Sequence, residues 1–338
     1  MSELKVGVVG TGGISRSHVP HWIALGAKVS VHSLLGAEEL AAQYGVPVVA
    51  VLEELFAGVD VVDICTPTAT HAALAVAAIE AGKHVVCEKP LGRTLADAQA
   101  VAAAARRAQV QVYPAHVVRY FPEYAALHAA VRRGQAGKLA VLRFSRGGSG
   151  PTSDWFFDDA ESGGIVTDLM IHDLDQARWI AGEVTRVFAV QNPPTVDGRI
   201  PRAVTAHVTL VHQSGAISHV HGAWGPPGME FPNAFDVAGE AATLRYDSRT
   251  PRTLVENFPP ATEGEPSYLP RTTAEESPYL TEIRELAQAF QGGPAPRVSL
   301  DDGVLAVALA EAARRSIDTG EPVDFDAAAV LATQEVGR

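Results

Sequence analysis

An acidic and a basic residue end an apolar run in the segment "GKHVVCEKPLGRT", where Cys87 to Pro90 read "CEKP". Such charges suit the carboxyl edge of a parallel sheet, because ligands of open α/β sheets bind in the crevice outside the strand ends. Pro90 biases Lys89 toward extended geometry, which would direct the Lys89 ammonium toward a substrate oxygen. Taken alone, the tetrapeptide fits a solvated ion pair at a strand end better than a catalytic site.

A glycine-rich turn near the N-terminus, "VGVVGTGGIS", has the spacing of a dinucleotide-binding loop. Gly10, Gly12 and Ser15 occupy its three positions, with Ser15 where glycine or alanine is usual. Because glycine has no side chain, backbone amides can approach a pyrophosphate at the start of the following helix. The residues expected to bind NAD or NADP here are Gly10, Thr11, Gly12, Gly13 and Ile14.

The second predicted strand lacks the acidic residue that usually binds the ribose of NAD. A carboxylate is expected about 20 residues after the glycine loop, whereas the sequence there is "VHSLLG", which includes Ser33. Ser33 could donate a hydrogen bond to the 2′-phosphate of NADP, and Arg16 could reach the same phosphate. We therefore expect NADP to bind at least as well as NAD. Ser33 also fits an ordinary loop residue, with the ribose held by backbone groups.

The first third of the chain alternates short β-branched runs with alanine-rich helical patterns, which is typical of a doubly wound parallel sheet. Thr70 and Gly82 have the residue types of an N-cap and a C-cap. Strands are predicted at residues 5–10, 27–33, 59–66, 83–89 and 110–116, and helices at residues 14–25, 37–45, 70–82 and 95–108.

From about Gly137 the pattern changes to longer strands joined by glycine-containing turns. These strands, among them "KLAVLRFSRG", "RVFAVQN" and "AFDVAGEAATLRYDS", predict a large, mostly antiparallel sheet, with a hairpin loop at "HQSGAI". Residues 250–278 are rich in Pro, Thr and Glu and predict an extended surface segment. A helical pattern follows at residues 299–320, so the second part is predicted to be α+β.

These motifs together resemble the Gfo/Idh/MocA family of NAD(P)-dependent oxidoreductases. The resemblance rests on "GTGGIS", "TPTATHAALAVAAIEAGKHVVCEKPLGRTLADA", "VVRYFPEY" and "GGIVTDLMIHDLDQARWIAG", and it covers nearly the whole chain. It implies a Rossmann domain over residues 1–121, an α+β substrate-binding and oligomerisation domain over residues 122–338, and a substrate cleft between them. The implied reaction is hydride transfer between the nicotinamide and a secondary alcohol of a sugar, inositol or related polyol.

The resemblance also implies roles for individual residues. The implied catalytic residues are Lys89, Asp168 and His172. The residues implied to bind the cofactor beyond the glycine loop are Thr66, Pro67, His71 and Glu88, in addition to Ser33, which the missing carboxylate already indicated.

Physical chemistry supports these catalytic roles. Asp168 and His172 are four residues apart in a helical pattern, so we expect them on one face, and Gly163 and Gly164 would let the helix start lie close to a ligand. Oxidation of an alcohol needs a base for the hydroxyl proton, which suits histidine. It also needs a cation near the developing alkoxide, which suits Lys89.

Other residues are expected to line the substrate cleft or a subunit interface. Possible substrate contacts are His116, Arg119, Arg146, Asp154 and Trp155. His207, His219 and His221 alternate along strands, and a metal site is conceivable there, but no carboxylate or cysteine lies at ligand spacing. We expect no metal, and a polar sheet face that packs against another subunit. A broad antiparallel sheet needs cover, and the resemblance implies a homodimer or homotetramer.

Composition and charge restrict the remaining classes of function. The chain has 338 residues, 47% of them hydrophobic, which suits two domains. Lys and Arg total 27 against 39 for Asp and Glu, and the net charge of −12 disfavours nucleic acid and membranes as partners. Cys65 and Cys87 lie in apolar runs, and neither a leader nor an apolar run of about 18 residues is evident. A cytoplasmic location is expected.

Two other functions use the same fold. A glycoside hydrolase that uses NAD transiently would also need C–H chemistry on a sugar, so the motifs fit it too. A dinucleotide-binding sensor without turnover is disfavoured, because a sensor could lose both Lys89 and His172, and this chain has both.

Overall fold

Two sheets organise the chain, a parallel one in the first third and a mostly antiparallel one in the middle. The computed structural model describes residues 3–250, 255–257 and 276–332. The chain forms two units. Unit 1 comprises residues 1–120, 276–307 and 331–338, and unit 2 comprises residues 121–275 and 308–330.

The units differ from the expected domains in the position of the first boundary and in the membership of C-terminal residues. The first boundary falls between Tyr120 and Phe121, one residue before the expected limit. Residues 276–307 belong to unit 1, although they were expected in the second domain. The physical reason is the amphipathic helix α9 (Pro278–Phe290), whose buried Ile283 and Leu286 join the hydrophobic core of unit 1.

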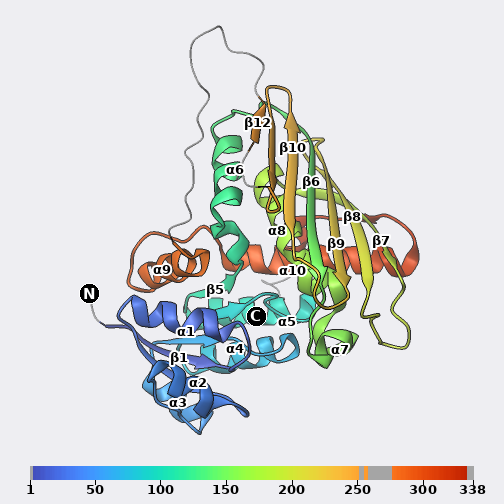
Figure 1. The fold of residues 1–338 in the computed structure, drawn as a ribbon. Coiled ribbons are helices and arrows are strands. Elements are labelled where there is room, and N and C mark those ends of the chain that lie inside the picture. Colours follow the sequence, from blue (N-terminus) through green and yellow to red (C-terminus); the bar gives the residue numbers. More distant parts are fainter. Residues whose placement is uncertain (1–2, 251–254, 258–275, 333–338) are drawn as a thin grey trace. The chain divides into compact units, whose positions relative to one another are not determined.

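The parallel sheet of unit 1 has the strand order β2-β1-β3-β4-β5 (Figure 1). This order confirms the predicted doubly wound sheet. It reverses between β1 and β3, and such a switch point is where doubly wound sheets leave a crevice for ligands at their carboxyl edge. The strands are β1 (Lys5–Val9), β2 (Lys28–His32), β3 (Val61–Ile64), β4 (His84–Glu88) and β5 (Val112–Ala115).

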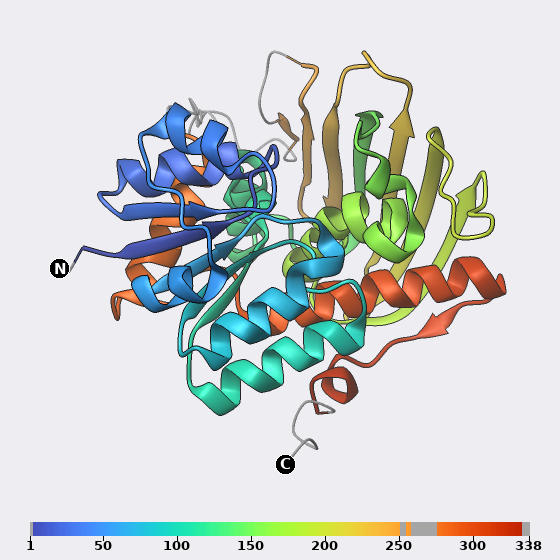
Figure 2. The same ribbon diagram turned by 90° about the horizontal axis from the view of Figure 1, so that it is seen from below.

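The four predicted helices of unit 1 are present, and a further short helix, α3 (Leu52–Gly58), was not predicted. Helices α4 and α5 lie side by side (Figure 2). In α5 a capping box joins Thr94 and Asp97, which satisfies free amides at the helix start. The predicted helices are α1 (Ser15–Ala24), α2 (Ala37–Tyr44), α4 (His71–Glu80) and α5 (Leu95–Ala108).

The ends of α4 only partly follow the expected capping. Gly82 has a φ of 73°, a left-handed conformation that glycine adopts easily, and it ends the segment as predicted. Thr70 precedes α4, but its hydroxyl lies 2.7 Å from Thr66 Oγ1 and 2.8 Å from the Pro67 carbonyl oxygen. Thr70 therefore stabilises the turn after β3 and does not cap the helix with its side chain.

The sheet of unit 2 has eight strands in the order β12-β11-β10-β6-β9-β8-β7-β13. Figure 1 labels β12, β10, β6, β9, β8 and β7, which follow one another across the sheet in this order. All neighbours are antiparallel except β6 and β9, which run parallel. The predicted hairpin between residues 212 and 217 joins β8 to β9. The strands are β6 (Leu139–Ser149), β7 (Val184–Asn192), β8 (Val204–His212), β9 (Ile217–Gly225), β10 (Asn233–Gly239), β11 (Thr243–Asp247), β12 (Val255–Asn257) and β13 (Val323–Asp324).

One face of this sheet is covered by the segment that contains Asp168 and His172. The segment begins with a single π-helical turn, η4 (Val166–Met170), and continues as α8 (Ile171–Ala181), which packs on β6 and on α6. The other helices of the second half are α6 (Pro122–Arg132), α7 (Asp159–Ser162), α10 (Leu300–Thr319) and α11 (Ala327–Ala332), with a short 3₁₀ turn, η3 (Asp154–Phe157).

Two further expectations concern a surface segment and membrane-spanning helices. Most of the predicted surface segment at residues 250–278 lies outside the described residues. Within the described part of the chain, we find no helix that combines the length and the apolar character needed to span a bilayer.

Candidate active site

The glycine loop after β1 brings the backbone against the end of β3. Gly10 has a φ of 101°, and a Cβ atom there would lie 2.6 Å from the carbonyl oxygen of Cys65, so only glycine fits. Around Gly12 and Gly13, by contrast, no described atom lies within 4 Å of an ideal Cβ position. This open space at the start of α1 is where a pyrophosphate fits, since helix N-termini bind anions.

Ser15 explains how the loop departs from the usual fingerprint. Its side chain is fully buried, and its hydroxyl donates to the carbonyl oxygen of Gly12 at 2.7 Å. The hydroxyl thus bonds the loop itself, and the third position tolerates serine without opening the packing of the helix. The residues present fit a dinucleotide at this loop.

The end of β2 presents a serine and two exposed leucines where the ribose is expected. Ser33 Oγ lies 3.3 Å from Thr11 Oγ1, while Leu34 and Leu35 are 94% and 83% exposed. Arg16 is not a free cation, because its guanidinium forms a 2.8 Å ion pair with Glu39 and also bonds Gln43. A phosphate would have to compete with Glu39 for Arg16.

His71 connects the ends of β3 and β4. Its Nδ1 lies 2.7 Å from the Pro90 carbonyl oxygen and its Nε2 lies 2.8 Å from the Thr66 carbonyl oxygen. Burial lowers the pKa of His71, an effect that these two acceptors oppose. The side chain contacts backbone on both sides, so its partners in the structure are the two turns that flank it.

Lys89 is the first residue after β4 to reach the surface. Residues 85–88 are buried, and Lys89 is half-buried. Glu88 is directed inward, because its Oε2 accepts the backbone N–H of Lys89 at 3.0 Å and its Oε1 lies 3.2 Å from His18 Nε2. The carboxylate that was expected on the cofactor side therefore has its partners within unit 1.

In unit 2, Asp168 and His172 stand out by their exposure. Every residue from 162 to 177 is buried except these two, which are half-buried. Asp168 lies in the π-helical turn η4 and His172 in the first turn of α8. The expected α-helical face is thus replaced by a π turn, with i to i+5 bonding, and such turns are frequent at functional sites.

Close backbone packing holds this π turn. Gly163 and Gly164 have φ values of 76° and 75°, and a Cβ atom on Gly163 would lie 2.8 Å from Thr167 Cβ. On the other side, a Cβ atom on Gly222 of β9 would lie 2.4 Å from Met170 Cγ. The two glycines before the helix serve the turn and its packing, which differs from the expected approach to a ligand.

Two of the residues expected to contact substrate, Arg119 and Arg146, form ion pairs within the protein. Arg146 is buried and bonds both oxygens of Asp173, at 2.9 and 3.0 Å. Arg119 is also buried, and its Nη1 donates to the Arg297 carbonyl oxygen at 2.7 Å and to Asp302 at 3.0 Å. This geometry favours a structural role for both arginines, because breaking a buried pair leaves an uncompensated charge.

The other three expected substrate contacts differ in exposure. His116 is 1% exposed. Asp154 is exposed and forms a 2.6 Å ion pair with Arg202, which is also at the surface. Trp155 is half-buried and stacks on Phe156 with ring centroids 3.8 Å apart. Asp154 and Trp155 are therefore the two that remain accessible to a substrate.

A buried polar group beneath the strand ends of unit 1 was not predicted from the sequence. His18 on α1 lies between Asp63 of β3 and Glu88 of β4, and both His18 and Asp63 are fully buried. A signal was available, since Asp63 is a charged residue inside the apolar strand "VVDI". A buried charge of this kind needs a partner.

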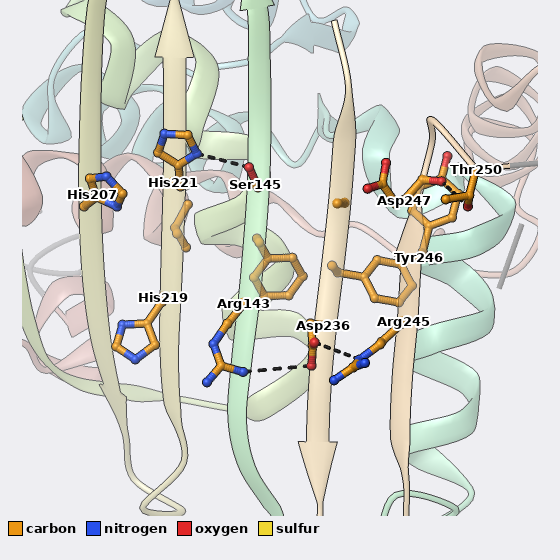
Figure 3. A pocket seen from close by; sticks show the side chains of 14 residues that line it. Arg143, Ser145, His207, His219, His221, Asp236, Arg245, Tyr246, Asp247 and Thr250 are labelled. Atoms are coloured by element: carbon orange, nitrogen blue, oxygen red, sulfur yellow. Dashed lines mark hydrogen bonds and ion pairs between the residues drawn. The ribbon is translucent and has the colours of Figure 1, made fainter. Parts of the chain in front are cut away.

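His207, His219 and His221 lie on the open face of the sheet of unit 2, shown in Figure 3. His207 and His221 stack with ring centroids 4.6 Å apart, and His221 also bonds Ser145 at 3.1 Å. Burial, and then the neighbouring His207, lowers the pKa of His221. His219 lies further along β9 and bonds Thr209 at 3.2 Å. The face carries a shallow hollow of about 610 Å³.

Comparison with known proteins places both halves of the chain. A family model described as "Oxidoreductase family, NAD-binding Rossmann fold" matches residues 4–116, and the "GFO/IDH/MocA C-terminal domain" matches residues 124–245. A myo-inositol 2-dehydrogenase of Thermotoga maritima is 32% identical over 273 residues, which cover 79% of this chain and 80% of that protein.

A relative and a solved structure cover nearly the full length. Myo-inositol dehydrogenase Hyg17 of Streptomyces leeuwenhoekii is 31% identical over 335 residues, with 94% of this chain and 98% of that protein covered. The crystal structure of GenD2 from gentamicin A biosynthesis in complex with NAD has a TM-score of 0.82 and 25% identity, covering 96% and 97%. The chain therefore belongs to the Gfo/Idh/MocA family of oxidoreductases with an NAD-binding Rossmann fold.

Proposed function

We propose that the protein is an NAD(P)-dependent dehydrogenase that transfers a hydride between the nicotinamide and a secondary alcohol of an inositol, a sugar or a related polyol. The observation that carries the proposal is the exposure of Asp168 and His172 alone in an otherwise buried segment of unit 2. The named activities of the inositol dehydrogenases similar to this chain support the substrate class.

The chemistry divides among three side chains. When bound, the nicotinamide ring supplies the hydride acceptor or donor. His172 takes the hydroxyl proton as a general base, and Asp168 orients the imidazole from the preceding turn. Lys89 supplies the positive charge that stabilises the developing alkoxide. The test is a panel of inositols, sugars and sugar acids, assayed by the absorbance of the reduced cofactor.

The two alternative functions make different predictions in the same assay. A glycoside hydrolase would release the aglycone from aryl glycosides with catalytic amounts of NAD and would show no net cofactor reduction. A sensor would bind dinucleotide and turn over no member of the panel. Net reduction of cofactor by a polyol supports the dehydrogenase.

For the cofactor, we propose that NADP binds at least as well as NAD, because the end of β2 carries Ser33 and no carboxylate. Introducing an acid should reverse this, since Ser33→Asp places a negative charge where a 2′-phosphate would lie. We expect Ser33→Asp to weaken NADP binding by about tenfold relative to NAD, or about 1.4 kcal/mol. Fluorescence titration of both cofactors on both proteins measures the effect. A tenfold preference of the unaltered protein for NAD would contradict the proposal.

We also propose that the open sheet face of unit 2 mediates association into a homodimer or homotetramer. Besides the histidines, this face carries Phe188 and Val190, which are 38% and 49% exposed and pair in register with Thr209 and His207. Exposed apolar side chains on a broad sheet favour burial against a second surface. We expect light scattering at micromolar concentration to show a dimer or larger species.

A substitution on this face tests the interface directly. Phe188→Glu should shift the protein toward monomer, because a charge would have to be buried on association. Ile23→Glu on α1 is the matched control, since Ile23 has the same 38% exposure but lies in unit 1. Monomeric wild-type protein, or equal effects of the two substitutions, would contradict this interface.

A further inference from the structure

A chain of buried polar groups runs beneath the carboxyl edge of the parallel sheet in unit 1. His18 Nδ1 lies 2.9 Å from Asp63 Oδ2, and His18 Nε2 lies 3.2 Å from Glu88 Oε1. At one end, the indole N–H of Trp22 donates to Asp63 at 2.7 Å. At the other end, Glu88 Oε2 accepts the backbone N–H of Lys89 at 3.0 Å. This series of hydrogen-bonded groups therefore connects the buried side of α1 to the backbone of Lys89.

The geometry favours the doubly protonated ring of His18. A neutral imidazole donates from one nitrogen only, whereas both nitrogens of His18 face carboxylate oxygens. Burial alone opposes the charged form, but the charge of Asp63 and its hydrogen bond outweigh this effect and raise the pKa of His18 well above its ordinary value. The imidazolium then pairs with two carboxylates that would otherwise be buried without a cation.

A third acid in the same region, Glu282, lacks the hydrogen-bond partners that Asp63 and Glu88 have among the described residues. Glu282 on α9 is fully buried, and neither of its carboxyl oxygens has a hydrogen-bond partner among the described residues. Burial raises the pKa of Glu282 well above its ordinary value, which favours its neutral form. The titratable groups around His18 are His21 on its own helix, Asp63 and Cys65 at the end of β3, Cys87 and Glu88 on β4, and Tyr279 and Glu282 on α9.

We propose that His18, held by Asp63, is a positioning residue for Lys89. The imidazolium fixes the Glu88 carboxylate, and the carboxylate in turn fixes the backbone N–H of Lys89 at the end of β4. The backbone of Lys89 is thereby held in one position, which keeps its ammonium group in place. Electrostatic catalysis is efficient only when the charged group is held in place in this way. The inference rests on the proposed function in one respect, namely that Lys89 acts on the substrate.

A metal centre is the competing interpretation. Ligand atoms of His18, Asp63 and Cys65 lie within 4.8 Å of one another, the one such group of three among the described residues. The hydrogen bonds described above already engage both nitrogens of His18 and the carboxylate of Asp63, and the Cys65 thiol donates to Asp63 Oδ1 at 3.7 Å. Each of these groups would have to give up a partner to bind a metal. We therefore assign a hydrogen-bonded ion chain.

The first test measures the Lys89 backbone without using activity. In His18→Gln, the Lys89 amide should exchange with solvent about tenfold faster than in wild type, because its acceptor Glu88 is no longer held. The amide of Val86, which lies within β4, should keep its protection. Hydrogen exchange followed by NMR resolves the two sites. Equal loss at Lys89 and Val86 would mean a general structural role and would overturn the proposal.

Two further variants control this result. Asp63→Asn keeps an acceptor for Trp22 and removes the charge that holds His18, so it should also loosen Lys89, and it replaces His18→Gln if that variant fails to fold. Glu282→Gln is isosteric with the neutral acid and should leave exchange at Lys89 within about twofold of wild type. If Glu282→Gln changed amide exchange at Lys89 more than His18→Gln did, the assignment of charges would be overturned. Stoichiometric zinc in the purified protein would overturn the ion chain.

The stability difference between wild type and His18→Gln should also depend on pH. Because the folded-state pKa of His18 is raised, its contribution is fully present below its unfolded value of about 6.5. The contribution is lost as the pH rises through the raised folded value. Urea unfolding of both proteins from pH 6 to pH 10 should show the wild-type advantage falling with pH. A constant or rising difference would contradict the imidazolium.

Steady-state kinetics complete the test on the best substrate from the panel. His18→Gln should lower kcat by about tenfold or more with the cofactor Kd within about threefold of wild type. An unchanged kcat together with the loss of Lys89 protection would keep the ion chain but overturn its role in positioning for catalysis. If wild type oxidises no polyol, the proposed function fails, while the exchange and unfolding experiments still decide the ion chain.

Discussion

Replacing His172 with alanine is expected to lower kcat by about 10²- to 10⁴-fold, which is the usual contribution of a general base. The cofactor affinity should stay within about twofold, because the glycine loop lies in unit 1 and His172 lies in unit 2. Raising the pH should restore part of the rate, since hydroxide can replace the missing base. The measurement combines kcat across a pH series with fluorescence titration of the cofactor.

His128 on α6 provides a matched control for this substitution. It is another half-buried histidine of unit 2, and it stacks on Trp179. His128→Ala should leave kcat near the wild-type value. If His172→Ala instead turned over normally, the base would have to be Asp168 or Tyr113. Burial raises the pKa of Tyr113, so its phenol is protonated at neutral pH and Asp168 would be the better candidate.

Replacing Lys89 with alanine is expected to be at least as damaging as the loss of His172. Removing one donor that stabilises a developing oxyanion commonly costs about 10²- to 10³-fold in kcat. The substitution also removes the half-buried side chain that directly follows the buried residues 85–88. The effect should appear in kcat more than in cofactor affinity, because the pyrophosphate is bound elsewhere.

Two other lysine variants sharpen this prediction. Lys89→Arg keeps the positive charge but not the compact ammonium, and it should retain only part of the activity. Lys83 lies before β4 and donates to the Val59 carbonyl oxygen at 2.9 Å. Lys83→Gln should therefore leave kcat nearly unchanged and alter stability at most. Near-normal kcat in Lys89→Ala would remove Lys89 from the catalytic residues.

The parts of the fold that could be predicted are those whose causes are local. The glycine loop was recognisable because Gly10 must adopt a positive φ against Cys65, and such positions select glycine. The strands of the parallel sheet were recognisable because each contains a short, mostly apolar run, as residues 6–9 of β1 show with four buried residues. Local residue types decide both features, so a single sequence reveals them.

The parts that could not be predicted depend on distant residues. The π turn at Val166–Met170 is held by the packing of Met170 on Gly222, which is 52 residues further along the chain. The ion pair between Arg146 and Asp173 could not be predicted either, because a sequence does not show which cation pairs with which carboxylate. The partners of Glu88 were missed for the same reason, since His18 is 70 residues away.

Residues 276–307 belong to unit 1 although they follow residues 121–275 of unit 2 in the sequence. This order affects how the chain folds during synthesis. Ile283, Leu286 and Val298 belong to the same core as Val19 and Trp22 of α1. The ribosome must therefore translate all of residues 121–275 before this core can close. Until then, α1 exposes an apolar surface whose burial stabilises by about 1.5–3 kcal/mol for each large side chain. The nascent N-terminal half therefore keeps this apolar surface, which favours aggregation, exposed for as long as the synthesis of residues 121–275 takes.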